Sequence, residues 1–571
     1  MKLKRLVPRM IIGATMAAMM AVPVSACNIN SGSTPPPIEF SRVSSTSADD
    51  NSGDNSGKVY DFKDPKTSGI VTVTKSWDDS SSNDERTVPD VSISTEKPSK
   101  SALGHVITYH GNGLSFPDGS IQNEIVINNS GKIVSGQYKE LYGSLGWYSD
   151  KACTQKVKVD SAGLPVNGIN ADLDLYAKQK TFVLKASYDF NNLIPSMATS
   201  VIFTNEIMPI SATLINVDKD GDNGVVAWMD KNVMKVSTQS YGQKAIITDC
   251  QGMFLNKSNL TTIDFNNLDT SNVKDMAGMF QGCEGLTSLN LSYLKTDEVT
   301  NMSYLFYHCT GLTDLDLGSL HTHKVTDMTY MFARCSSITS LDLTSLDTSE
   351  VTSMRGMFGN CSDLTNLDLT PLDTQNVTNM SGMFSSCKSL TSMDLSPLNT
   401  KNVTDMSWIF SSCVGLSSID LSPLDTNNVT DTSFMFYGCT GLKTLDLTSM
   451  NTSKVVTMQQ MFYDCSGLTS LDLTSLDTRN VMGMSGMFQG CKSLINLDLS
   501  SLNTQKVTSM NSMFLDCDSL STLSIGEKFA FVGTYYNLPS DTWYSSNGTA
   551  YISNGNSCTI PSNKADTYTR K

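Results

Sequence analysis

The sequence is poor in positive charge. Its 571 residues contain 41 Lys and Arg against 56 Asp and Glu, which gives a formal net charge of −15. After the N-terminal segment, no stretch gathers Lys and Arg, and proteins that bind phosphate backbones need such a cluster. We therefore expect no nucleic-acid partner. Only 17% of the residues are charged, a composition that correlates with secreted surface proteins.

Motifs that carry catalysis are also missing. The sequence contains no nucleophile elbow, no phosphate-binding loop, no HExxH pair and no paired-carboxylate motif. The only acidic residues that recur do so at the fixed interval of a structural repeat. We therefore expect neither an enzyme nor a cofactor.

The N-terminus predicts export. Four basic residues precede an apolar segment at 10–26 that ends in small residues, which is typical of a signal segment over 1–26. Pro23 and the polar run after Cys27 argue against the alternative of a membrane-spanning anchor. The closing VSAC resembles a bacterial lipobox, which implies that Cys27 is lipidated and holds the protein at a membrane face. Ordinary signal-peptide cleavage after the same VSA is the alternative.

The segment 27–101 is rich in Ser, Asp, Pro and Thr and has almost no apolar periodicity. Such a segment buries too little apolar surface to offset its ordering entropy. It predicts a disordered tether, in which VYDF and GIVTVTKSW are candidate short strands.

Residues 102–180 alternate apolar and polar residues between Gly and Asn turns, which predicts a small β-rich domain. The stretches ITYHGNG, LGWYSDKACT and LDLYAK resemble the internalin-type B-repeat, a spacer module of bacterial surface proteins. The resemblance implies a β-grasp-like fold. Trp147 and Tyr148 are then expected to be core and sheet residues, not a platform for a ligand.

Residues 181–250 predict a β-rich linker and N-terminal cap, because they lead directly into a repeat array whose first edge needs shielding. Within them, DKDGDNG at 218–224 has the three alternating aspartates that begin a calcium loop. However, Asn223 stands where the sharp-turn Gly belongs, and Met229 stands where the bidentate acid belongs. We favour a hairpin turn here and expect no metal.

One 26-residue unit is repeated over 251–526. A fixed period in the twenties predicts a solenoid, and the LxxLxL stretches fit the strand of a leucine-rich repeat. In SLDLT, Leu341 and Leu343 should point inward and Asp342 outward. The apolar residues of 351–364 follow at intervals of three or four, which predicts a helix or 3₁₀ segment as the outer wall. The Phe of the repeated Met-Phe pair stands at 254, 280, 306, 332, 358, 384, 410, 436, 462, 488 and 514.

The wording of the repeat also resembles a known family. LDTSEVTSMRGMFGNCSDLTNLDL is similar to the units of BspA-like leucine-rich repeat surface proteins of bacteria. The resemblance implies a mainly repeat α/β solenoid, a right-handed array of about ten coils over 251–526. It also implies surface display and adhesion to host proteins or other microbes. Residues 527–571 resemble the closing segment of such proteins and predict a C-terminal cap.

Ten cysteines follow the same period, and an exported chain with this many cysteines invites a disulfide framework. If the outer wall is helical, neighbouring coils stay about 8 Å apart there, beyond the usual reach of a disulfide. We therefore expect buried free thiols that act as small core residues. Metal ligation by His308, Cys309 and the HTH at 321–323 is a weaker alternative, as is a protease dyad of the first two. The ten are Cys283, Cys309, Cys335, Cys361, Cys387, Cys413, Cys439, Cys465, Cys491 and Cys517.

A column of aspartates stands at the outward strand position. If the strands line a concave face, this column forms an acidic groove for a basic protein segment or for cations. The alternative is that each Asp accepts hydrogen bonds from nearby Ser or Thr groups. A column of invariant Thr, one per unit from Thr270 to Thr504, should satisfy backbone groups at the turn. The column of candidate binding residues is Asp264, Asp316, Asp342, Asp368, Asp394, Asp420, Asp446, Asp472 and Asp498.

Together these features predict a tethered, adhesin-like recognition protein of the bacterial cell surface. Its array would bind protein or glycan components of a host or of other microbes. A structural spacer with no ligand of its own is the alternative. Because the repeated residues hold the coil together, specificity should lie in exposed residues that vary, such as Glu350 and Arg355 against Asn376 and Ser381 in the next unit.

Overall fold

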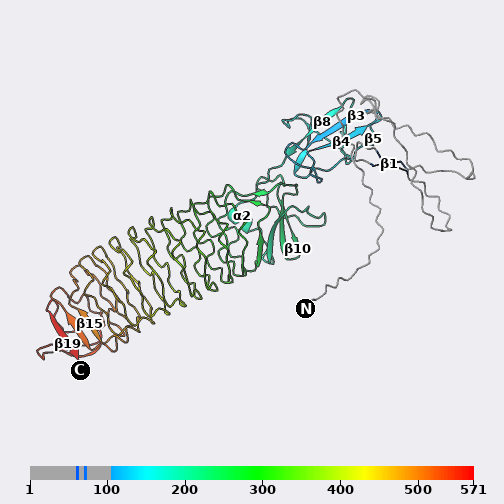
Figure 1. The fold of residues 1–571 in the computed structure, drawn as a ribbon. Helices are drawn as coiled ribbons and strands as arrows, with labels where there is room; N and C mark the ends of the chain where they lie inside the picture. The colour runs from blue at the N-terminus through cyan, green and yellow to red at the C-terminus, as the bar shows by residue number, and fades with distance from the viewer. Residues whose placement is uncertain (1–59, 64–69, 74–103) are drawn as a thin grey trace, which may run out of the picture. The chain divides into compact units, whose positions relative to one another are not determined.

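The computed structural model describes residues 60–63, 70–73 and 104–571 (Figure 1). The predicted signal segment 1–26 and the predicted lipidation at Cys27 lie outside the described residues. The two candidate strands of the predicted tether are present: β1 (Tyr60–Lys63) pairs antiparallel with β2 (Ile70–Val73). They belong to one compact unit of the chain, and residues 104–571 belong to another.

The first domain of the second unit is a six-stranded sheet in the order β5-β4-β3-β8-β6-β7. Its central pair, β3 and β8, is parallel, and the other pairs are antiparallel. Trp147 is buried and packs edge-on against Tyr109 at 4.9 Å between ring centroids, so its predicted place in the core is confirmed. The strands are β3 (His105–His110), β4 (Gln122–Ile127), β5 (Ile133–Ser135), β6 (Ser144–Tyr148), β7 (Lys156–Val157) and β8 (Leu173–Gln179).

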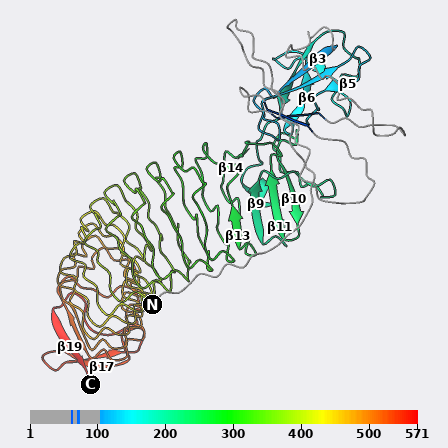
Figure 2. The same ribbon diagram turned by 45° about the vertical axis from the view of Figure 1, so that its right-hand side comes forward.

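A second sheet, in the order β10-β11-β9-β13, lies where the repeat array begins (Figure 2). Strand β9 pairs in parallel with β13, which belongs to the first coil, so the edge of the array is covered by ladder hydrogen bonds. Phe203 of β9 stacks on Phe265 of that coil at 6.5 Å. The elements are α2 (Ser187–Asn191), β9 (Ser200–Thr204), β10 (Val226–Asp230), β11 (Val233–Ser237), β12 (Ala245–Ile246), β13 (Thr262–Asp264) and β14 (Leu268–Asp269).

Helix is scarce in this sheet-rich structure. Within the described part of the chain, α2 is the one helix, and its five residues form little more than a turn. Accordingly, the described residues include no helix with the length and apolar character needed to cross a bilayer.

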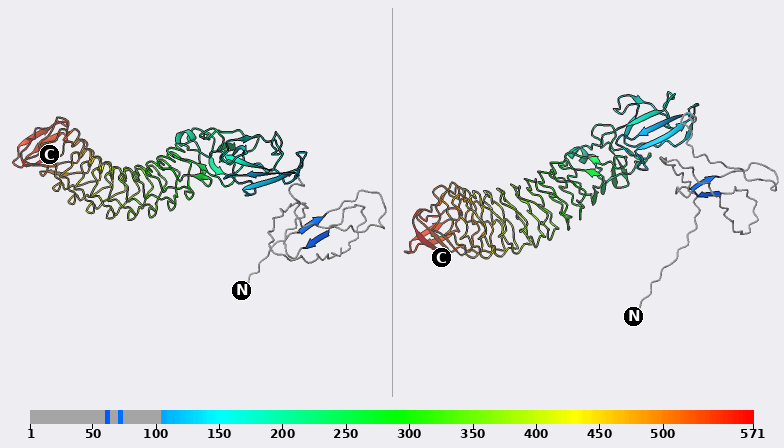
Figure 3. Two further views of the ribbon diagram at one scale, coloured as in Figure 1. Left: turned by 90° about the horizontal axis from the view of Figure 1, so that it is seen from above. Right: turned by 45° about the horizontal axis from the view of Figure 1, so that its top comes forward.

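The repeats form a stack of similar coils (Figures 1 and 3). Parallel bridges join neighbouring coils at a constant spacing of 26 residues, as from Asp327 to Ser353 and on to Asn379. Leu341 and Leu343 are buried and Asp342 is exposed, as the alternation in SLDLT predicts. Within the array, extended strands appear only toward its ends, where β13 and β14 lie in the first coil and β15 (Asn496–Leu499) and β16 (Thr522–Ile525) lie in the last two coils.

The outer wall is made of successive turns, so the predicted helix or 3₁₀ segment is wrong. The amide of Phe332 donates to the Met357 carbonyl of the next coil at 3.0 Å, whereas the amide of Met331 donates back to Met328 at 3.1 Å. Backbone donors alternate in this way along the wall. Tyr330 and Arg334, four residues apart, have left-handed φ values of 53° and 62°, which a helix does not allow. Four-residue turns space apolar side chains much as a helix does, and the sequence pattern does not separate the two.

The Phe of each coil forms a continuous buried stack from Phe254 to Phe514. Neighbouring rings are nearly parallel, with centroids 5.5–6.2 Å apart. Each ring is at most 1% exposed. The burial of these apolar rings favours the packing of each coil on the next.

All thirteen cysteines among the described residues are free thiols. The ten repeated cysteines are buried free thiols, as expected. The expected reason, a helical wall that keeps the coils about 8 Å apart, was wrong, because hydrogen-bonded turns bring the coils closer together than helices would. Instead, each repeated thiol donates to the carbonyl of the Phe one coil earlier, as Cys361 does to Phe332 at 3.1 Å. The other nine make the same contact at 3.0–3.2 Å.

The repeated Thr also joins coils, as its expected role at backbone groups implies. The buried Thr374 hydroxyl donates to the Asn399 carbonyl at 3.1 Å and accepts the Asn399 amide at 2.7 Å. One side chain therefore satisfies a backbone donor and a backbone acceptor of the following coil.

The C-terminal end of the stack is closed by an antiparallel extension (Figure 3). Strand β16 pairs in parallel with β15 on one side and antiparallel with β19 on the other. Trp543 is fully buried within this sheet. Its remaining strands are β17 (Asp541–Tyr544), β18 (Ala550–Ser553) and β19 (Asp566–Arg570).

Replacing Thr374 by Val should destabilise the protein by about 1–3 kcal/mol, because the amide and the carbonyl of Asn399 each lose a hydrogen bond worth about 0.5–1.5 kcal/mol. Thr378 of the same coil is exposed and donates only to Thr352, at 3.3 Å, so Thr378→Val is a matched control with an effect within about 0.5 kcal/mol. Chemical denaturation of both variants measures the difference. Equal stabilities would show that the hydroxyl bridge contributes nothing.

The ten repeated cysteines should be unreactive in the folded protein and free in the unfolded one. Burial raises the pKa of the Cys361 thiol to about 12, so little thiolate forms at pH 8. Alkylation with iodoacetamide followed by mass spectrometry, in native buffer and in guanidinium without reductant, measures both states. Fewer than eight free thiols after unfolding would contradict the structure.

Candidate functional site

The predicted acidic column is present on the surface, but its carboxylates serve the coil. Each aspartate of the column accepts the backbone amide two residues later through Oδ1, at 2.8–2.9 Å. At Asp342, Asp446 and Asp472, the Thr hydroxyl at the same place adds a second bond of 2.7 Å. Asn290 fills the one gap in the column and accepts its amide in the same manner.

These hydrogen bonds have an electrostatic consequence. At Asp420, the Ser422 amide and hydroxyl hold the carboxyl pKa below its usual value, while the neighbouring Asp446 and Asp394 act in the opposite sense. The local bonds prevail over the repulsion between coils. The Asp420 carboxyl therefore stays ionised at neutral pH, with one of its oxygens committed to the turn.

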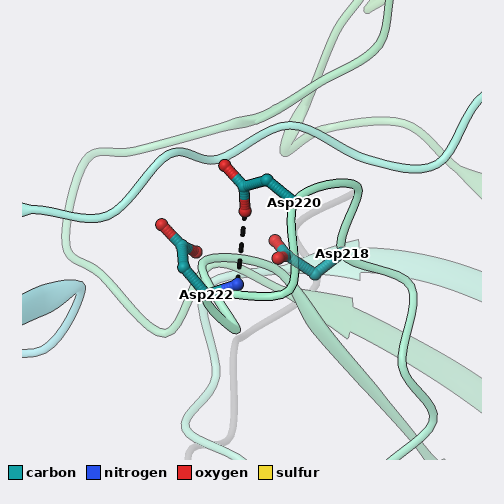
Figure 4. A group of neighbouring side chains, drawn as sticks. All are labelled: Asp218, Asp220 and Asp222. Atoms are coloured by element: carbon teal, nitrogen blue, oxygen red, sulfur yellow. Dashed lines mark hydrogen bonds between the residues drawn. The ribbon is translucent and has the colours of Figure 1, made fainter.

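The three aspartates of DKDGDNG converge in the linker before the array (Figure 4). One carboxylate oxygen from each of Asp218, Asp220 and Asp222 lies within 4.8 Å of the others, the only such cluster of three potential metal ligands in the described residues. The carboxylates are occupied by the turn itself: buried Asp218 accepts the Gly221 and Val225 amides at 2.7 and 3.1 Å. Desolvation raises the pKa of Asp218. The predicted hairpin turn describes this arrangement.

The His and Cys residues considered as a metal site or a dyad do not assemble. The buried Cys309 thiol faces the Phe280 carbonyl at 3.0 Å. His321 bonds to Asp297 at 2.7 Å, and the His308 ring lies 3.8 Å from Glu284. Each group therefore has a separate local partner.

The turn wall also carries a surface that sequence reasoning did not identify, here called the aromatic face. It consists of two groups of aromatic rings. Burial raises the pKa of Tyr304 and of Tyr437, so their hydroxyl groups stay protonated and can donate hydrogen bonds. In the second group, Trp408 stacks on Phe434 with centroids 3.8 Å apart, and Tyr437 stacks on Tyr463 at 4.4 Å. Trp408 is 39% exposed. The members are Tyr304, Tyr307 and Tyr330 in the first group and Trp408, Phe434, Tyr437 and Tyr463 in the second.

Four of these aromatic residues occupy a backbone position that favours glycine. Tyr304, Tyr330, Trp408 and Phe434 have φ values of 53–61°, in the left-handed region. Such a conformation costs a non-Gly residue about 1–3 kcal/mol, and an aromatic pair returns only about 0.5–1.5 kcal/mol beyond its burial. The fold accepts glycine there, since the equivalent residues of other coils are Gly278, Gly356, Gly382 and Gly486. The backbone at this position therefore does not require an aromatic residue.

A groove of about 420 Å³ separates the two groups of rings, with Tyr330 at one end and Trp408 at the other. Gly356 makes room for the Tyr330 ring, because a Cβ at Gly356 would lie 2.1 Å from Tyr330 Cε1. The rest of the lining is glycine or polar, and apart from Arg355 its side chains are small. It comprises Arg355, Gly359, Asn360, Ser381, Gly382, Ser385, Asp405 and Ser407.

Two guanidinium groups flank the Tyr330 end of the groove. Arg355 lies over the Tyr330 ring at 5.7 Å, and Arg334 lies over the Tyr307 ring at 5.6 Å. Both are exposed, and neither guanidinium forms an ion pair within residues 104–571. A second hollow of about 350 Å³ contains Arg334 and shares Tyr330 and Asn360 with the groove.

Part of this site was predictable. Arg355 is exposed, as predicted, and lines the groove. Ser381 also lines the groove, but it is only 6% exposed and bonds to Asn379, so its predicted exposure was wrong. The aromatic members were missed because they were read within single units. Aligning the units shows a column that holds Gly in five of them, Tyr, Trp or Phe in four, and Gln or Ser in two, and that contrast is the available signal.

Comparison with solved structures finds leucine-rich repeat proteins at low identity. A leucine-rich cell surface protein from Faecalibacterium prausnitzii is 15% identical, with a TM-score of 0.24, over 57% of this chain and 87% of that one. A leucine-rich repeat protein from Leptospira interrogans is 15% identical, with a TM-score of 0.15, over 45% and 70%. The functional domain of InlJ from Listeria monocytogenes, described as including a cysteine ladder, is 17% identical, with a TM-score of 0.16, over 49% and 70%.

Comparison with curated protein sequences finds no match. Comparison with protein families matches residues 229–341, 332–440 and 415–526, each to the family described as "Mycoplasma protein of unknown function, DUF285". The three matches together span 229–526, just over half of the 571 residues. The chain therefore belongs to the DUF285 family.

Proposed function

We propose that this protein is an exported, surface-tethered bacterial recognition protein that binds a macromolecular partner, protein or glycan, through its repeat array. The role is adhesin-like and non-enzymatic. One observation carries the proposal: the residues that repeat are buried or bonded to the backbone of the coils, whereas aromatic residues that break the repeat gather into the aromatic face. A wall that only spaced other domains would have no use for rings in left-handed positions.

The remaining assignments belong to the same proposal. Residues 1–26 direct export, and Cys27 carries the lipid that anchors the chain to a membrane through 27–101. Residues 102–180 are a B-repeat-like β-grasp module, and 181–250 and 527–571 cap the array. The array over 251–526 is a right-handed leucine-rich repeat solenoid of about ten coils, related to the BspA-like surface proteins.

Two surfaces of the array are available to a partner. The first is the acidic column, proposed as a concave groove for a basic protein segment or cations, since one oxygen of each carboxylate remains outside the turn bond. The second is the aromatic face, which offers the exposed Trp408 ring, six partly buried rings and two guanidinium groups without ion pairs. The two differ in charge, so salt and substitution separate their contributions.

Binding should map to the array. We expect the labelled full mature chain to bind epithelial cells or other microbes saturably and to be displaced by unlabelled chain. Hydrogen exchange on the bound protein should show added protection within 251–526 and none within 102–180. Protection confined to 102–180, or no saturable binding to any surface tested, would favour a spacer without a ligand.

The acidic column can be tested without disturbing the coil. In the triple variant Asp394→Asn, Asp420→Asn and Asp446→Asn, each amide oxygen can accept the turn amide as Asn290 does, so the fold should be kept. The thermal unfolding midpoint at pH 7 should fall only slightly, because a neutral acceptor replaces an ionised one. If the column contacts the partner, cell binding should fall and lose its salt dependence. Unchanged binding would limit the column to its role in the turns.

A further inference from the structure

We propose that the aromatic face binds an oligosaccharide that carries a carboxylate, with one sugar ring stacked on Trp408 and the carboxylate beside Arg334 and Arg355. This inference rests on the proposed function, recognition by the array, and names the chemical class of the partner and the place where it binds. The groove between Tyr330 and Trp408 is the binding site.

The rings at both ends of the groove suit the faces of sugars. The C–H groups on one face of a pyranose carry slight positive charge and pack against the negative face of an aromatic ring. Trp408 is exposed, and Phe434 holds its indole from behind at 3.8 Å with an angle of 8° between the rings. A ring fixed in this way presents a flat surface with little entropy left to lose on binding.

The lining between the rings suits hydroxyl groups. Asn360, Ser385 and Asp405 offer amide, hydroxyl and carboxylate groups along one groove. Asp405 uses Oδ1 to accept the Ser407 amide at 2.9 Å, which fixes the direction of its carboxylate. Glycines at 359 and 382 keep the floor low, so a ligand can approach the backbone. An apolar peptide anchor would find few aliphatic side chains here.

The guanidinium groups make the Tyr330 end of the groove positively charged. Arg334 and Arg355 have no acidic partner, while the chain as a whole carries a net charge of −15. A planar guanidinium can bind a carboxylate through two parallel hydrogen bonds. Asp405 lies in the same groove as Trp408, so a neutral sugar fits that end and an acidic sugar fits the Tyr330 end. Two arginines are too few for the basic track that single-stranded nucleic acid requires.

The test uses the full mature chain and a panel of immobilised oligosaccharides, in which members ending in sialic acid or containing uronic acid are paired with matched neutral members. We expect acidic members to bind. Trp408→Gly and Tyr330→Gly should each weaken that binding at least tenfold. Both variants should fold with an unchanged or higher unfolding midpoint, because other coils carry glycine at the same left-handed position.

Further variants separate stacking from charge. Trp408→Tyr keeps a ring and should retain part of the affinity. Arg355→Gln should weaken binding of acidic members while leaving that of the matched neutral members unchanged, and 0.5 M salt should have the same selective effect. Tyr293 is 40% exposed on the array and outside the aromatic face, so Tyr293→Ala is the matched control and should bind as the parent does.

Several results would overturn the inference. It fails if no oligosaccharide of the panel binds, if binding survives in the double Tyr330→Gly and Trp408→Gly variant, or if a proline-rich peptide or oligothymidylate binds in place of sugars. A lower unfolding midpoint in Trp408→Gly, together with unchanged binding, would mean that the stack is structural. If the double variant still binds cells with array protection, the proposed function stands and this inference falls; if the parent binds no cell surface, both fall.

Discussion

The structure depends on direct backbone hydrogen bonding between coils that stand 26 residues apart. Every second amide of the turn wall donates to the next coil, and the intervening amides close turns within their own coil. This alternation is possible only if residues such as Tyr330 and Arg334 adopt left-handed conformations four residues apart. The Phe stack, the thiol contacts and the Thr bridges all follow from that one spacing. Each of the three contacts joins one fixed position of a coil to one fixed position of its neighbour, so it recurs along the whole array.

The period and the burial pattern of the array follow from the sequence alone. The burial of Leu341, Leu343 and the Phe column could be predicted, because the alternation of apolar and polar residues and the fixed period indicate which side chains face inward. The turn wall could not be placed, because Val351, Met354 and Phe358 have the spacing of a helix as well as that of four-residue turns. The left-handed residues that separate the two are not confined to Gly: Tyr330, Arg334 and Asn360 adopt the same conformation.

The candidate site shows the same division. The aspartate column could be recognised in the sequence because it repeats. Its hydrogen bonds to turn amides show that these repeated residues stabilise the coil. The aromatic face depends on which residues break the pattern and on which coils are neighbours. Arg355 and Ser381 could be named from their variability, but their meeting in one groove with Trp408 requires the stack. In a repeat protein, function is best sought among the departures from the repeat.

The distance between the two ends of the groove is a whole number of coil spacings. Between Tyr330 and Trp408 lie two coils with glycine at the same position, Gly356 and Gly382. Because no ladder tolerates a shift of a single residue, recombination between repeats can lengthen or shorten the array only by complete units. Loss of these two units would bring the rings together and close the groove, and gain of one would widen it by the roughly 6 Å between neighbouring Phe rings. In the proposed mode of binding, the number of units between the two rings would therefore set the length of the ligand, while Tyr330 and Trp408 at the ends stay the same.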